Sequence, residues 1–219
     1  MTSELEAEIG DAERVALNYA KPDIRLRLAS FFALDRRLGQ IVANSSEPML
    51  GQMRIAWWRD MLKSSAEDRP AGDVVLDAIG ASWEEGAHQL QPLADAWEVF
   101  LIAEDLTSSV LEEFALGRAM PFAHALGCTH EGAAKLARDA GSLWALADTA
   151  AHVSDQSERE LILEQARAKL DVNTSAAPIP RTLAVLTALS RRSIRRGGCP
   201  LMDGRGAALV ALRAGLIGK

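Results

Sequence analysis

Hydrophobic residues recur at helical spacing in almost every segment of the chain. Between residues 24 and 42, for example, Leu34, Leu38 and Ile41 lie at positions i, i+4 and i+7, the spacing of a helix with one side against a core. Alternation of apolar and polar residues, which is typical of a half-buried strand, does not occur. The pattern therefore predicts an all-α fold.

The same spacing, together with proline, glycine and capping residues, divides the chain into helices. The expected ranges are 11–20, 24–42, 48–65, 73–85, a region after Pro92, 107–127, 131–153, 155–170, 181–196 and 204–217. We expect Pro22 to interrupt the first helix and Pro121 to kink or restart the helix that contains it. Asp73 and Thr129 are the expected N-caps of the helices that follow them, and residues 173–180 are expected to form a loop.

Two of these helices carry more detailed predictions. The helix 131–153 is apolar on nearly every side, as is typical in the middle of a bundle, so we expect it to be the most buried. In the helix 48–65, Met53 and Trp57 share a side with Met61, and we expect that side to pack on the preceding helix. Trp58 then points elsewhere, toward a pocket wall or an interface.

Length and charge limit the classes of function. The 219 residues suffice for one domain with a sizeable core. A formal charge of −6 argues against general nucleic-acid binding. The N-terminal segment 1–22 is acidic, whereas residues 181–219 hold eight Lys or Arg and a single acid, Asp203. Such a basic end is most typical of a solvated helical face, and it also suits an anionic membrane surface or an acidic partner.

Cysteine content and hydropathy bear on location. Two cysteines, Cys128 and Cys199, form no disulfide framework, which favours a reducing compartment. No apolar run approaches the roughly 18 residues that a membrane span requires, and the acidic N-terminus is unlike a signal peptide. We therefore expect a cytoplasmic protein, either free or peripheral to the inner face of the membrane.

The most specific pattern lies within residues 28–62. It has the form E-P-x-x-G-x-x-R-x-x-W-W-R-D-x-L, formed by Glu47, Pro48, Gly51, Arg54, Trp57, Trp58, Arg59, Asp60 and Leu62. This segment resembles the opening of squalene/phytoene synthases, and residues 93–101 and the C-terminal helices resemble later family segments. The resemblance implies a single helical bundle of the isoprenoid-synthase type over residues 1–219, built around a central apolar cavity.

Active members of that family condense two prenyl diphosphates, and magnesium held by two aspartate motifs on facing helices neutralises the leaving group. By the resemblance, the first motif should lie at residues 39–43, which contain no acid, and the second near Asp148, His152 and Asp155, which form no four-carboxylate cluster. The tyrosine-containing loop that follows it in active members is missing. The resemblance therefore implies a member without catalytic residues or a cofactor.

Three functions follow from this resemblance. The first is a non-catalytic scaffold or lipid binder, like the synthase-like assembly factors of respiratory complex I, with a protein or a membrane surface as its partner. The second is a prenyltransferase with degenerate motifs, which would use magnesium. The third is an isoprenoid-binding module without chemistry.

The candidate pocket or ligand-binding residues are Arg36, Arg54, Trp57, Trp58, Asp148, His152 and Asp155. Arg36, Arg54 and Arg59 suit a phosphate group, and they suit ion pairs with Asp35, Asp60 or Glu47 equally well. Asp148 and His152 lie four residues apart on one helix face, where they can contact each other. The trio His124, Cys128 and His130 matches no common zinc spacing, so we expect no metal ligand.

Overall fold

The computed structural model describes residues 3–170 and 180–218. Its α-helices are α1 (Ser3–Ala7), α2 (Asp11–Leu17), α3 (Pro22–Ala43), α4 (Pro48–Lys63), α5 (Val74–Trp83), α6 (Gln91–Ile102), α7 (Ser108–Ala125), α8 (Glu131–His152), α9 (Gln156–Ala168), α10 (Arg181–Arg195) and α11 (Gly204–Ile217). Two 3₁₀ helices, η1 (Ala66–Asp68) and η2 (Glu84–Leu90), join them. These described residues contain no strand, which confirms the all-α prediction.

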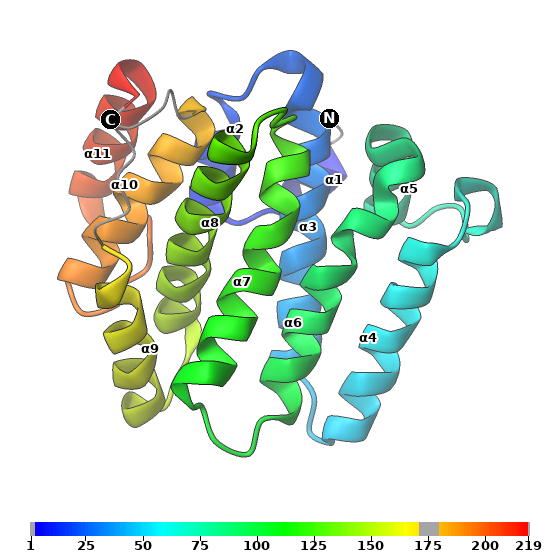
Figure 1. Cartoon of the computed structure of the whole chain (residues 1–219), viewed down its shortest axis with the longest axis horizontal. Helices are drawn as coiled ribbons and strands as arrows, with labels where there is room; N and C mark the ends of the chain where they lie inside the picture. Colours follow the sequence, from blue (N-terminus) through cyan, green and yellow to red (C-terminus); the bar gives the residue numbers. More distant parts are fainter. Residues whose placement is uncertain (1–2, 171–179, 219) are drawn as a thin grey trace.

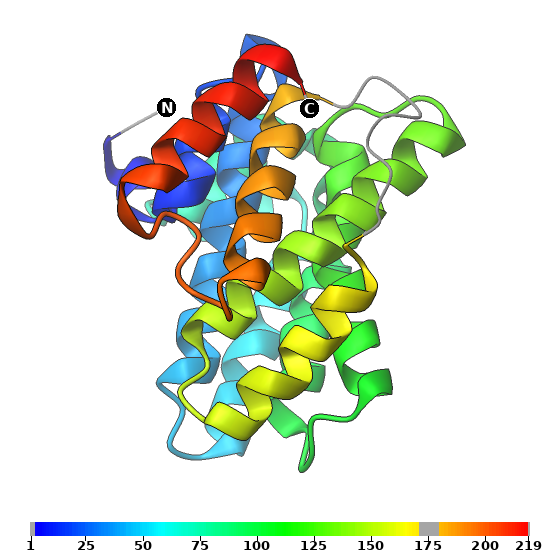
Figure 2. The same cartoon turned by 90° about the vertical axis from the view of Figure 1, so that its left-hand side faces the viewer.

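The longer helices form a row, with α3 lying behind it (Figure 1). Along the row α4 packs on α6, α6 on α7, α7 on α8, α8 on α10 and α10 on α11. Helix α3 contacts α4, α5, α6 and α7 from behind. Figure 2 shows α9 and α10 covering the side of α8 that faces away from α7. Helices α4 and α11 therefore form the two ends of the row.

An aromatic core joins α3, α7 and α8. The ring centroids of Phe31 and Phe122 are 4.8 Å apart, and those of Phe122 and Trp144 are 5.5 Å apart. Phe32 completes the group at 5.7 Å from Trp144. Helices α7 and α8 approach closely because Gly141 faces Phe122; a Cβ atom there would lie 2.7 Å from the ring. Burial of these large side chains anchors the three helices to one another.

Most helix boundaries agree with the sequence pattern within a few residues. The side chain of Asp73 accepts hydrogen bonds from the backbone N–H groups of Val75 and Leu76, which confirms it as an N-cap. Pro22 does not simply interrupt a helix, because it begins α3, where its missing N–H is not needed. The expected cap at Thr129 is wrong, since His130 precedes α8. Most of the expected loop 173–180 lies outside the described residues.

Helix α7 and the segment after α5 also differ from expectation. Helix α7 runs through Pro121 without restarting. Residues 84–90, expected partly as helix, form the 3₁₀ helix η2, and Glu84 there has a positive φ of 47°. The short helix α1 was not expected from the pattern.

The prediction for the inner face of α4 is wrong. Trp57 is 42% exposed and Met53 65% exposed, whereas Trp58 is only 4% exposed. The buried side of α4 consists of Gly51, Ile55, Trp58 and Leu62. Gly51 fixes this rotation, because a Cβ atom there would lie 2.7 Å from side-chain atoms of Leu101 and Ser45. The side of α4 that carries Gly51 must therefore face the body of the molecule.

Helix α8 has the largest number of buried residues, as expected, but α10 has the larger buried fraction. Eleven of its 22 residues are buried, more than in any other described helix. In α10, however, ten of 15 residues are buried, because α8, α9, α11 and α2 all pack on this helix.

Among the described residues no helix is both long and apolar enough to cross a bilayer.

Candidate functional site

A cavity of about 810 Å³ lies between α2, α3, α6, α7, α8 and the segment that connects α10 to α11. Its apolar walls include Phe32, Trp97, Phe100 and Trp144. Its polar side chains include Glu13, Asp35, Arg118, Asp148 and His152. The volume lies within the range of sites that hold a small molecule.

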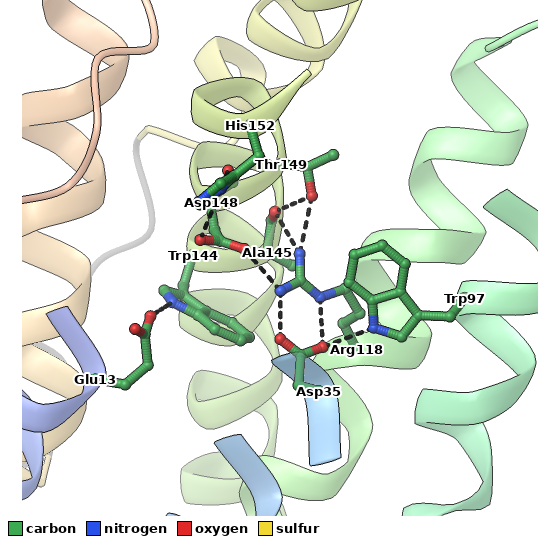
Figure 3. Close-up of polar contacts among 9 residues, drawn as sticks. All are labelled: Glu13, Asp35, Trp97, Arg118, Trp144, Ala145, Asp148, Thr149 and His152. Atoms are coloured by element: carbon green, nitrogen blue, oxygen red, sulfur yellow. Dashed lines mark hydrogen bonds and ion pairs between the residues drawn. The ribbon is translucent and has the colours of Figure 1, made fainter. Parts of the chain in front are cut away.

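Arg118 of α7 occupies the centre of this site and is fully buried. Its Nε donates to Asp35 Oδ1 at 2.9 Å, and one terminal nitrogen donates to Asp35 Oδ2 at 2.5 Å. The same terminal nitrogen donates to Asp148 Oδ2 at 2.9 Å (Figure 3). Asp35 lies on α3 and Asp148 on α8, so one guanidinium links two helices that face each other across the cavity.

The remaining donors of Arg118 are also satisfied. Its other terminal nitrogen donates to the backbone oxygen of Ala145 at 3.0 Å and to Thr149 Oγ1 at 2.8 Å. These contacts match the five N–H donors of a guanidinium. The guanidinium carbon lies 4.8 Å from the ring centroid of Trp97 and 4.6 Å from that of Trp144, which adds cation–π attraction. Arg118 therefore has no donor left for a ligand.

Two tryptophans donate hydrogen bonds to carboxylates of this cluster. Trp97 of α6 donates from Nε1 to Asp35 Oδ1 at 2.9 Å, and Trp144 of α8 donates from Nε1 to Glu13 Oε1 at 2.7 Å. Glu13 belongs to the short helix α2, which covers the cavity. The residue before α2 is Gly10, where a Cβ atom would lie 2.2 Å from Glu13 Oε2. The bare backbone at Gly10 is thus what admits the Glu13 side chain.

Burial and ion pairing act in opposite directions on the pKa values of the central pair, Asp35 and Arg118. Burial raises the pKa of Asp35, and the charge and hydrogen bonds of Arg118 oppose that rise. Burial alone would lower the pKa of Arg118, but the charges of Asp35 and Asp148 outweigh it and raise that pKa above its usual value. The guanidinium of Arg118 therefore remains positively charged between the two carboxylates.

Glu13 is a second carboxylate of the cluster whose pKa burial raises. Burial, with the negative charge of Asp148 as the next cause, raises the pKa of Glu13 to about 7, and the hydrogen bond from Trp144 opposes this rise. Within residues 3–170 and 180–218, no ion pair to Glu13 offsets its burial, whereas Asp35 is paired with Arg118.

At the rim of the cavity lie three of the residues expected from sequence. His152 is close to Asp148, with its Nδ1 2.8 Å from the backbone oxygen and 3.4 Å from Oδ1, so the expected contact is present. Asp155 also lines the cavity, but its carboxylate caps α9 by accepting from the backbone N–H groups of Ser157 and Glu158. Arg36 lines the same rim and is exposed.

The other expected site residues lie elsewhere. Arg54, Trp57 and Trp58 belong to α4, from which no residue lines the cavity. Arg59 pairs with Asp95 and Glu98 of α6, and not with Asp60 or Glu47. Within this pattern, Arg59 joins α4 to α6, Trp58 is buried and Trp57 is exposed, and all three are separate from the cavity.

Arg118, Glu13, Trp97 and Trp144 are the site residues that sequence reasoning missed, and Asp35 was considered only as an ion-pair partner. A signal for Arg118 does exist in the sequence. It lies four residues after Phe114 and four before Phe122, which puts a charged residue on the apolar side of its helix. A charge in that position must be buried with partners, and such partners mark a polar cluster.

The described residues do not fit a metal centre. Among residues 3–170 and 180–218, no group of three or more His, Cys, Asp or Glu side chains could hold a metal ion. The two carboxylates that face each other across the cavity are both bonded to Arg118, so this donor set does not fit a magnesium cluster. Of the zinc trio, His124 stacks on Trp83 with ring centroids 5.1 Å apart.

Comparisons of the chain with protein-family models, with curated proteins and with solved structures find no match. The resemblance to squalene/phytoene synthases therefore stays a prediction from the sequence.

Proposed function

We propose that this protein is a non-catalytic, squalene/phytoene synthase-like bundle that binds an isoprenoid or a related lipid in its central cavity. The observation that carries the proposal is Arg118, which is fully buried and bonded to both Asp35 and Asp148. The guanidinium of Arg118 occupies the space between these two carboxylates, where a metal ion would otherwise bind.

This arrangement argues against transfer of a prenyl group. Ionisation of a prenyl diphosphate creates an anionic leaving group whose charge must be met as it develops. Asp35 and Asp148 already neutralise a guanidinium, and the donors of that guanidinium are directed at protein acceptors. Neither a metal nor Arg118 is thus positioned to take the charge of a leaving diphosphate.

The lining favours a ligand with an apolar body and an uncharged head group. Aromatic rings of Phe32, Trp97, Phe100 and Trp144 form the walls, and such surfaces gain free energy by covering apolar groups. The polar cluster contains three carboxylates and one guanidinium, so its field disfavours an anion. An isoprenoid alcohol suits this lining better than a diphosphate does.

Calorimetric titration of the whole chain with farnesol and with farnesyl diphosphate tests the proposal. We expect farnesol to bind, and farnesyl diphosphate to bind more weakly and to release no pyrophosphate with or without magnesium. Val42→Trp, which places an indole in the cavity wall, should abolish farnesol binding. The matched control is Val99→Trp on α6, a half-buried residue that does not line the cavity, and it should bind farnesol as the parent does.

Two outcomes would contradict the proposal. Magnesium-dependent release of pyrophosphate from farnesyl diphosphate, abolished by Asp148→Ala with Asp155→Ala, would establish the prenyltransferase alternative. Equal loss of farnesol binding in both tryptophan variants would show that the cavity is not the binding site.

A scaffold role toward a protein partner, as in assembly factors of respiratory complexes, is the second candidate. Its support is the outer side of α4, where Met49, Leu50, Met53 and Trp57 are exposed by 42–71%. A partner that copurifies in fixed stoichiometry with the parent chain, and is lost from the Met53→Ser/Trp57→Ser variant, would favour this role. Retention of that partner by the variant would exclude α4 as the contact.

A further inference from the structure

Helix α11 packs on the molecule through its smallest residues. Its buried side consists of Ala207, Ala211, Ala214 and Gly215, and it rests on α10 and α2. Gly215 faces Tyr19, where a Cβ atom would lie 2.2 Å from the phenol ring. Such close contact fixes the rotation of α11, so its outer face is as well defined as its inner one.

That outer face carries the large apolar side chains of the helix. Leu209 is 69% exposed, Leu212 50%, Leu216 62% and Ile217 61%. Amphipathic helices of globular proteins show the opposite arrangement, with large apolar residues inward and polar residues outward. Contiguous exposed apolar side chains of this kind mark a surface that meets another apolar phase.

The charges around this apolar stripe are basic. Arg205 and Arg213 are exposed and lie at helical spacing from the leucines on the outward side. Helix α11 contains no acidic residue. Arg195, at the end of the neighbouring α10, is also exposed, while Arg196 pairs with Asp203 at 3.5 Å.

We propose that α11 is a docking helix that lies in the plane of an anionic lipid surface. Leucines on one side with arginines beside them, and no acid, are the features of an interfacial helix. The arginine stems can lie along the apolar stripe while their guanidinium groups reach lipid phosphates. Charge distinguishes α11 from α4, where the exposed bases Arg54 and Lys63 are balanced by the exposed acids Glu47 and Asp60.

The position of α11 relative to the cavity gives this docking a consequence. Pro200, Leu201 and Met202, in the segment between α10 and α11, line the cavity. A molecule docked through α11 therefore holds this wall of the cavity next to the bilayer, where a lipid can exchange. The docking rests on exposure and charge alone, and it does not depend on the proposed ligand.

Cosedimentation of the full chain with vesicles tests the proposal. We expect binding to vesicles of phosphatidylcholine with phosphatidylglycerol, weak binding to phosphatidylcholine alone, and weaker binding as salt rises. Leu212→Ser/Leu216→Ser should lower the affinity by at least about tenfold, because it removes apolar area that docking buries. Leu50→Ser/Met53→Ser on α4, the matched control, should bind vesicles as the parent chain does.

Further variants separate the charge from the apolar contribution. Arg205→Gln/Arg213→Gln should lose most of the preference for phosphatidylglycerol while keeping the helical circular dichroism of the parent chain. Farnesol titration of the Leu212→Ser/Leu216→Ser variant keeps the two proposals distinguishable. Intact farnesol binding with lost vesicle binding supports docking through α11 and leaves the cavity proposal standing.

Three results would overturn the docking proposal. One is equal binding to vesicles with and without phosphatidylglycerol, and another is equal loss of binding in the α4 control. The third is self-association of the parent chain in sedimentation equilibrium that Leu212→Ser/Leu216→Ser abolishes, without vesicle binding by either. That result would make the outer face of α11 an interface between copies of the chain.

Discussion

The aromatic core and the ion cluster are adjoining layers contributed by the same three helices. On α3, Phe31 precedes Asp35 by four residues; on α7, Arg118 precedes Phe122 by four; on α8, Trp144 precedes Asp148 by four. One helical turn therefore separates an apolar layer from a charged one. Trp144 belongs to both, because its ring packs on Phe122 and its Nε1 donates to Glu13.

The two layers owe their persistence to different physics. The aromatic layer gains free energy from removal of apolar area from water. The charged layer must first overcome the desolvation of its ions, and a buried ion pair is often no more stabilising than an apolar replacement. The aromatic layer therefore supplies the stability of this region. The charged layer is better explained by its role in shaping the polar lining of the cavity.

Removal of one central side chain from each layer should be similarly costly and should respond differently to pH. We expect Phe122→Ala to lose about 3–5 kcal/mol of unfolding free energy through the cavity it creates. Arg118→Ala should lose about 3–5 kcal/mol because it leaves the buried carboxylate of Asp35 and the half-buried carboxylate of Asp148 without their cation. Urea unfolding at pH 5 and pH 8 separates the two variants when each loss is taken relative to the parent chain at the same pH. The loss in Arg118→Ala should be smaller at pH 5, because acid protonates Asp35, whereas the loss in Phe122→Ala should be the same at both pH values. Equal pH responses would contradict the comparison.

Glu13 should make the charged layer pH-dependent in the parent chain. Its pKa in the folded state is raised from 4.5 to about 7, so the folded chain binds one proton more than the unfolded chain between these values. The free energy of unfolding should therefore fall as pH rises through this interval, by a total on the order of 3 kcal/mol. Glu13→Gln should remove this fall, measured by urea unfolding at several pH values. A slope that survives in Glu13→Gln would assign it to another group.

Replacement of the central ion pair by apolar residues should be far milder than its disruption. We expect Asp35→Leu/Arg118→Leu to lie within about 2 kcal/mol of the parent chain, because the one carboxylate that loses its cation, Asp148, is half-buried and keeps its contact with His152. Trp97 loses its acceptor in this variant, which accounts for part of the residual loss. Thermal unfolding beside Arg118→Ala provides the measurement. If the double variant is as unstable as Arg118→Ala, the ion pair is itself a source of stability.

The two tryptophans of α4 provide a reference outside both layers. Trp57→Ala should change the unfolding free energy by less than about 1 kcal/mol, because the side chain is 42% exposed. Trp58→Ala, its neighbour and control, should lose about 3–5 kcal/mol as other large buried aromatics do. Denaturant unfolding of the two variants compares them directly. The reverse order would restore the rotation of α4 that the hydrophobic pattern predicts.

Periodicity predicted the helices and the apolar layer because burial of large residues at fixed spacing is a local property. Leu34 and Leu38 are fully buried as expected. Periodicity could not predict the rotation of α4 about its axis, because this rotation depends on the close approach of Gly51 to Leu101 and Ser45. Contacts of this kind join residues distant in sequence.

Only the local part of the candidate site could be predicted from the sequence. Asp148 and His152 lie on one helix, so their spacing alone places them together. The contact between Arg118 and Asp35 spans 83 residues of sequence. Asp35 gave no hint of its partner, because Arg36 and Arg37 next to it offered closer ones. A charged residue between two apolar turns, as at position 118, is the pattern that would have found the cluster.

The enclosure of Arg118 gives the protein a built-in spectroscopic probe. Its Nε proton is buried and hydrogen-bonded to Asp35, so it should exchange with water slowly enough to appear in a proton–nitrogen correlation spectrum. The rings of Trp97, Phe114 and Trp144 lie within 5.4 Å of the guanidinium, and their ring currents should displace its resonance from those of the exposed arginines. A ligand that moves either tryptophan would shift this one signal, so occupancy of the cavity can be followed without labelling the ligand.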